Sequence, residues 1–332
     1  MTRIEDGGGI MRNAHRPVVS RRGFCLCCLA STTYAATGGW LTPKQAFAEA
    51  RNVVDSMRGE AANAPVTVHK LRGNVSALVG SGGNIAVLTG RDGKILVDAG
   101  ITASRSKIMG ALANLGGEPI THLVNTHWHF DHADGNEWLR GQGAIIVAHE
   151  NTRKHLSEAT RVEDWDFNFP PSPPSAIPSE VVTADRTMKL GGSTFELKHY
   201  GPAHTDGDLS VRFSEADVIH AGDIYWKSYP FIDYSTGGNI DGTIRAAEAI
   251  LASATDQTII VPGHGHPSSG RSELKDYRDM LVAVREKVAT LKRQGRTVDE
   301  VLTAKPTATF DAIWGQFVMG PAQFTKLVYA GV

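Results

Sequence analysis

The chain has 332 residues, 41% of them hydrophobic and 21% charged, which supplies the core of one large folded unit and excludes a disordered or fibrous chain. Its formal net charge is -1, and beyond the N-terminal segment no run of Lys or Arg is longer than two residues. Nucleic-acid binding needs a basic stripe, so we expect no nucleic-acid partner.

The first 48 residues are predicted to be a twin-arginine signal peptide. Residues 20–26 read SRRGFCL, a moderately apolar stretch continues to residue 41, and residues 46–48 (AFA) form a small-x-small cleavage pattern. Ser, Thr and Gly make this stretch too polar for a membrane anchor of about 20 apolar residues. We therefore expect export to the periplasm, removal of all three cysteines with the signal, and no stable membrane insertion of the mature domain, residues 49–332.

The first half of this domain is predicted to begin with antiparallel strands, because short apolar runs alternate with glycine-rich turns. The expected strands cover residues 66–69, 76–79, 84–88 and 94–97. A helix over residues 104–115 and strands over 120–125 and 144–148 follow, so strand and helix alternate in this part.

A proline-rich connection over residues 169–178 leads into a second half of similar kind. Its expected strands cover residues 188–190, 193–199, 209–213, 218–221 and 259–261. Helices are expected over residues 244–253 and 273–293, and residues 297–332 are expected to form a C-terminal helical cap. Composition and periodicity alone therefore predict an α/β or α+β fold.

Residues 126–132 read THWHFDH and place three imidazoles and a carboxylate in one short turn after a predicted strand. His and carboxylate are common zinc ligands, and loops at strand ends are where such sites are assembled. Three later turns, each directly after an apolar run, carry one further candidate each: His204, Asp223 and His264. The pattern therefore predicts a metal centre built from well-separated segments.

These residues, in this order, resemble the metallo-β-lactamase superfamily of metallohydrolases over roughly residues 66–267. The resemblance implies a four-layer αββα sandwich and two Zn2+ ions per chain. By this likeness the first ion is held by His127, His129 and His204, and the second by Asp131, His132 and His264, with Asp223 between or beside them. The flavin-linked di-iron branch has Glu at the position of His129, which favours zinc here.

The segment after Asp223 resembles the matching region of broad-spectrum zinc β-lactamases, in which a Lys pairs with the substrate carboxylate and an Asn lies near the lactam carbonyl. Lys227 and Asn239 are the matching residues, and with Asp131 they are the expected catalytic residues. Those enzymes have Cys where this chain has Asp223, and a carboxylate there is a feature of the lactonase and thioesterase branches.

The sequence thus predicts an exported dinuclear zinc hydrolase of a small-molecule substrate, which opens β-lactam rings through a zinc-bound hydroxide. Asp131 is either a ligand or the group that orients the hydroxide proton. A lactone or thioester hydrolase of the same superfamily, and a metal-binding protein without turnover, are the alternatives. The sequence leaves the oligomeric state open.

Three supporting roles are also expected. Asp98, at the end of a strand, should accept the free N–H of a ligand histidine. By the resemblance, the turn over residues 80–84 corresponds to the flap that closes over substrate in β-lactamases, although it is short, rich in glycine and without an aromatic residue. Four aromatic residues are expected to form an apolar wall beside the metals: Trp165, Trp226, Tyr229 and Phe231.

The export signal gives a first testable prediction. A reporter fused to residues 1–48 should reach the periplasm by the twin-arginine route, and replacing Arg21 and Arg22 together by Lys should keep it in the cytoplasm, because that route reads the arginine pair. Cell fractionation with reporter activity measures this outcome. Unchanged translocation of the double variant would show that the signal has been misread.

Overall fold

A computed structural model describes residues 53–190 and 192–332, so the predicted signal peptide lies outside the described residues. The first half of the described chain forms a seven-stranded sheet with the order β1-β2-β3-β4-β5-β6-β9. Its strands are β1 (Thr67–Arg72), β2 (Val75–Val79), β3 (Ile85–Gly90), β4 (Gly93–Val97), β5 (Ile120–Val124), β6 (Ile145–His149) and β9 (Glu180–Val182). Strands β1 to β4 pair antiparallel, whereas β4, β5, β6 and β9 run parallel. The carboxyl ends of these four strands therefore meet at one edge.

A second sheet of five strands has the order β10-β11-β12-β13-β14. Its strands are β10 (Arg186–Leu190), β11 (Ser193–His199), β12 (Leu209–Phe213), β13 (Val218–His220) and β14 (Ile259–Val261). The first four pair antiparallel, and β14 joins β13 in parallel. All five strands overlap with the predicted ones.

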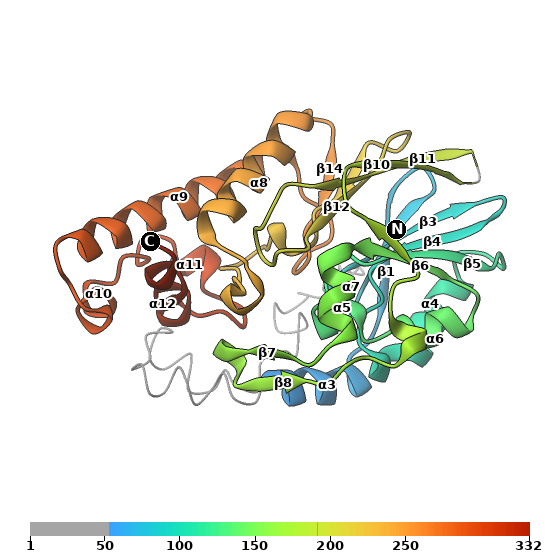
Figure 1. Ribbon diagram of the computed structural model, residues 1–332. Helices are drawn as coiled ribbons and strands as arrows, with labels where there is room; N and C mark the ends of the chain where they lie inside the picture. The colour runs from blue at the N-terminus through green and yellow to red at the C-terminus, as the bar shows by residue number, and fades with distance from the viewer. Residues whose placement is uncertain (1–52, 191) are drawn as a thin grey trace, which may run out of the picture.

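The two sheets pack face to face, with helices on both outer sides (Figure 1). Apolar residues of the two sheets, among them Val97 and Phe213, share one buried core between the sheets. On the outer side of the first sheet, Ile108 and Leu139 from helices α4 (Arg105–Ala113) and α6 (Asn136–Gly141) pack in a second core. The two sheets and the helices outside the first sheet account for three layers of the predicted αββα sandwich.

Helices α8 (Ile240–Ser253) and α9 (Arg271–Arg293) complete the fourth layer on the second sheet. Ile260 of β14 lies in one buried cluster with Ile250 and Leu281 of these helices. The predicted four-layer αββα sandwich is confirmed. No helix among residues 53–190 and 192–332 has both the length and the apolar character needed to cross a bilayer.

The predicted C-terminal cap consists of α10 (Val298–Ala304), α11 (Asp311–Trp314) and α12 (Pro321–Gly331), which gather beside α9 (Figure 1). Tyr229 belongs to this cap. Its ring stacks on Phe324 at 4.7 Å, and its hydroxyl donates to Asp311 Oδ1 at 2.8 Å. The prediction that Tyr229 lines the metal site is therefore wrong, because its side chain is buried in the packing of the cap.

Several elements were not predicted: helices α3 (Val53–Asn63), α5 (Phe130–Ala133), α6 and α7 (Glu150–Ser157), strand β9, and a hairpin of β7 (Thr160–Val162) and β8 (Phe167–Phe169). Helix α3 contacts both α5 and the β7–β8 hairpin through one side chain. The Arg58 guanidinium lies 5.4 Å from the ring centroid of Phe130 in α5 and 5.9 Å from that of Phe167 in the hairpin. The hairpin is thus held beside the turn that carries the predicted metal ligands.

Candidate metal centre

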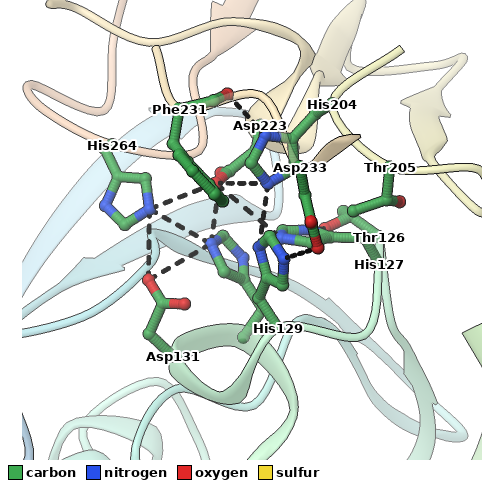
Figure 2. A network of polar contacts seen from close by, with 12 residues as sticks. Thr126, His127, His129, Asp131, His204, Thr205, Asp223, Phe231, Asp233 and His264 are labelled. Atoms are coloured by element: carbon green, nitrogen blue, oxygen red, sulfur yellow. Dashed lines mark hydrogen bonds and ion pairs between the residues drawn. The ribbon is translucent and has the colours of Figure 1, made fainter. Parts of the chain in front are cut away.

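All seven predicted metal ligands converge at one edge of the sandwich, and Figure 2 labels each of them except His132. They lie in turns that follow strands β5, β11, β13 and β14. They fall into two groups, in each of which the ligand atoms lie within 4.8 Å of one another. The first ligand group is His127, His129, His204 and Asp223, and the second ligand group is Asp131, His132 and His264. Every one of these side chains is buried.

Asp223 connects the two ligand groups, as the resemblance implied. Its Oδ2 lies 3.4 Å from Nε2 of both His204 and His264, and 3.7 Å from Nε2 of His127. Its Oδ1 lies 3.1 Å from Nε2 of His132. One carboxylate therefore faces both groups, and it fixes how far apart they stand.

Only glycine fits at two positions beside this cluster. A Cβ at Gly263 would overlap the carboxylate of Asp223, and a Cβ at Gly83 would overlap the ring of His132. The turn that contains Gly83 is also tied to the ligand loops, since Asn84 N donates to Gly263 O at 2.7 Å. The prediction of a substrate flap is wrong for this turn, because it supports the ligands instead of lying free above them.

The donor atoms suit a divalent metal. Nε2 of His127 is buried and has no hydrogen-bond partner among the described residues, which leaves its lone pair free for coordination. Nitrogen and carboxylate oxygen without sulfur are a normal zinc ligand set. Four buried carboxylates also meet here, those of Asp98, Asp131, Asp223 and Asp233. Buried charge needs opposite charge close by, which two divalent cations would supply.

Histidines of the two ligand groups have pKa values that are shifted in opposite directions. Burial lowers the pKa of His127 well below its ordinary value and lowers that of His129 too. Burial also disfavours charge on His264, but the carboxylates of Asp223 and Asp131 outweigh it and raise the pKa of His264 to about 9. The same balance raises the pKa of His132. Without metal, the second ligand group therefore holds protons where a cation would bind.

The ring nitrogens that point away from the cluster are held by other groups. Nδ1 of His132 donates to Asp98 Oδ2 at 2.7 Å, and Nδ1 of His204 donates to the carbonyl of Phe231 at 2.8 Å. The prediction that Asp98 accepts from a ligand histidine is confirmed. Asp98 also accepts from the backbone and hydroxyl of Thr126, and these bonds hold it at φ 67°, which is uncommon outside glycine.

Asp233 supports His129 in the same way, and the sequence did not reveal it. Its Oδ2 accepts from Nε2 of His129 at 3.0 Å and from Oγ1 of Thr236 at 2.6 Å, and the residue is fully buried. Nδ1 of His129 is then the atom that faces His204, at 2.9 Å from its Nε2. Asp233 follows no predicted strand and belongs to no motif, so no local pattern marked it.

The two residues expected to bind substrate are engaged elsewhere. Lys227 Nζ pairs with the carboxylate of Glu273 in helix α9. Asn239 caps the N-terminus of helix α8, where its Oδ1 accepts from Gly242 N at 2.6 Å. The aromatic residues Trp165, Trp226 and Phe231 do lie against the ligand histidines.

The αββα sandwich with these seven donors at one edge defines the chain as a metal-binding protein of the metallohydrolase type. The sequence profile of the metallo-beta-lactamase superfamily matches residues 78–291, which is more than half of the chain. The chain therefore belongs to the metallo-beta-lactamase superfamily, whose members are metal-dependent hydrolases.

Similar proteins within the superfamily differ in activity. The chain is 23% identical over 165 residues to a probable metallo-hydrolase, YqgX, of Bacillus subtilis, covering 48% of this chain and 74% of that protein. It is 22% identical to the metallo-beta-lactamase IND-1 of Chryseobacterium indologenes (46% and 58% covered). It is 26% identical to a hydroxyacylglutathione hydrolase of a Polaromonas species (47% and 52% covered). The last two matches thus span little more than half of each relative.

Solved structures share the fold. A sec-alkyl sulfatase, PisA1, superposes with a TM-score of 0.63 at 15% identity, covering 82% of this chain and 51% of that one. A metallo-beta-lactamase from Pontibacter korlensis gives a TM-score of 0.52 at 20% identity, covering 65% and 99%. Since that structure is matched almost completely but covers only 65% of this chain, the chain has residues beyond those of that sandwich.

The raised pKa values predict proton release on metal binding. At pH 7 the metal-free protein holds protons on His132 and His264, and a histidine must be neutral to coordinate. Zinc binding should therefore release about two protons per chain. The number should fall as the pH rises through about 9, where His264 loses its proton without metal.

Calorimetric zinc titrations in buffers of different ionisation enthalpy measure this number. The heats should depend on the buffer at pH 7 and depend on it less at pH 10. Heats that are independent of the buffer at pH 7 would show that neither histidine carries a proton before zinc binds.

Proposed function

We propose that this chain is a dinuclear zinc hydrolase that cleaves the amide, ester or thioester bond of a small molecule. The convergence of the two ligand groups around Asp223 carries this proposal. Bound zinc would supply Lewis-acid polarisation of the substrate carbonyl and a water of lowered pKa. The first ion would be held by the first ligand group and the second ion by the second.

The chain's own residues hold the parts of this site in place. Asp98 and Asp233 fix the orientation of His132 and His129, so that the remaining nitrogen of each ring faces the cluster. Asp131 Oδ2 lies 3.2 Å from Nε2 of His264. In this position Asp131 would serve the second ion as a ligand, or would accept and orient the proton of the attacking water.

Two substrate classes follow from the relatives. The likeness to IND-1 supports β-lactam ring opening. For that reaction Lys227 would have to leave Glu273, and Asn239 the N-terminus of α8, in order to contact the substrate. The likeness to a hydroxyacylglutathione hydrolase, together with a carboxylate rather than a thiolate at position 223, supports lactone or thioester hydrolysis. The pairing of Lys227 with Glu273 favours the second class, since it leaves no free cation for a substrate carboxylate at that position.

The proposal includes export to the periplasm, which rests on the sequence of residues 20–48. A metal-binding protein without turnover is the alternative function. It would bind zinc at the same residues and hydrolyse nothing.

A substrate panel tests the proposal. The zinc-loaded protein should hydrolyse at least one substrate in a panel of chromogenic β-lactams, lactones and thioesters. Chelation should lower the hydrolysis rate at least about a hundredfold, and adding zinc should restore it. No cysteine follows Cys28 in the sequence, so the predicted mature domain offers no thiol as a metal-independent nucleophile. Rates are compared by absorbance under zinc-loaded, chelated and restored conditions.

Two outcomes would contradict the proposal. Activity that persists in rigorously metal-free protein would exclude the metal-dependent reaction. Full zinc occupancy without turnover of any substrate in the panel would favour the metal-binding protein instead.

A further inference from the structure

The side chains of Trp226 and Lys227 point to opposite sides of the segment that follows Asp223. The backbone of Trp226 forms a parallel bridge with His264, and Lys227 N donates to His264 O at 3.1 Å, so this segment runs extended beside a ligand loop. Consecutive side chains of an extended chain point to opposite faces. Lys227 turns toward Glu273, whereas the ring of Trp226 lies 4.3 Å from that of His264.

Trp226 also reaches the first ligand group, since its ring centroid lies 6.3 Å from that of His204. The residue is only 6% exposed, and its Nε1–H has no hydrogen-bond partner among the described residues. A buried donor without an acceptor is uncommon and unfavourable. Beside a site that acts on carbonyl groups, an oxygen of the bound substrate is the acceptor that would satisfy it.

Aromatic rings flank both ligand groups. Phe317, in the loop between α11 and α12, lies 6.0 Å from His264 and 6.1 Å from Trp226 between ring centroids. Trp165, in the β7–β8 hairpin, lies 4.9 Å from His129 and stacks on Phe231 at 4.8 Å. Phe317 and Trp165 are both partly exposed. Solvent therefore reaches apolar rings on two sides of the cluster.

Among the described residues, the two cations that flank these rings are already paired, so a substrate carboxylate would meet apolar rings there and no free side-chain cation. Lys227 pairs with Glu273, and Arg58 lies 3.7 Å from Asp134 with its guanidinium over aromatic rings.

We propose that Trp226 is the residue of this segment that contacts the substrate, with its indole N–H donating to a substrate oxygen. The site accordingly selects uncharged acyl compounds with an apolar group, held between Phe317 and Trp165, over compounds that carry a carboxylate. This inference rests on the proposed function for the reaction, but its binding part requires no turnover.

The test measures binding of two probes to the zinc-loaded full-length protein by calorimetry. Benzohydroxamate is an aromatic carbonyl compound that binds zinc through its hydroxamate group, and 4-carboxybenzohydroxamate differs from it only by one further charge, a carboxylate on the ring. Benzohydroxamate should bind at least about tenfold more tightly, because the added carboxylate would lie among apolar rings without a free side-chain cation. This comparison needs no variant.

Trp226→Phe keeps the ring and removes the donor. It should weaken benzohydroxamate binding about three- to tenfold, the effect of one lost hydrogen bond. Trp138→Phe is the matched control, since Trp138 is also a buried tryptophan without a partner for Nε1, but it packs in the core on the far side of the first sheet. Trp138→Phe should leave both affinities unchanged. Zinc content and thermal melting confirm that each variant is loaded and folded.

The inference would be overturned if the carboxylate probe bound more tightly than benzohydroxamate and this difference in affinity disappeared in a Lys227→Ala variant. It would also be overturned if Trp226→Phe and Trp138→Phe changed the affinities equally, or if neither probe bound. The expected binding pattern without hydrolysis of any panel substrate would leave the inference standing and refute the proposed function. The two failures are therefore distinguishable.

Discussion

Burial of four carboxylates at one edge of the sandwich is the constraint on which the rest of this structure depends. Asp98, Asp131, Asp223 and Asp233 are each at most 4% exposed. Isolated buried carboxylates cost several kcal/mol each, so they persist only beside positive charge and hydrogen-bond donors. The described structure meets this need in part with five histidines and with the hydroxyls of Thr126 and Thr236. Divalent cations, which the donor set suits, would supply the remaining positive charge.

The same carboxylates join the two halves of the chain. Asp98 follows the first sheet and orients His132, while Asp223 follows the second sheet and faces both ligand groups. Asp233 comes from the connection before α8 and holds His129, which follows the first sheet. The second half thus supplies two acids, Asp223 and Asp233, that face histidines of the first half, and Asp131 of the first half lies 3.2 Å from His264 of the second. The ligand geometry depends on how the sheets pack, and metal binding should stabilise that packing in turn.

Much of this arrangement was predictable from the sequence, for physical reasons. The ligands of residues 127–132 lie in one turn, so their spacing alone constrains them, and His204, Asp223 and His264 each follow a recognisable strand. Lys227 and Asp233 were not predictable in this way. The partner of Lys227 is 46 residues away, and Asp233 meets a histidine 104 residues away, so both contacts exist only once the sandwich is assembled. The β7–β8 hairpin has strands of three residues, too short for a periodic pattern.

Anomalous diffraction from crystals of the zinc-loaded protein, measured on both sides of the zinc absorption edge, tests the central claim most directly. The account predicts two zinc peaks per chain, one bound by His127, His129 and His204 and one by Asp131, His132 and His264, with Asp223 in contact with at least one of them. A single peak, or peaks only on the protein surface, would contradict the dinuclear centre on which the proposed function is built.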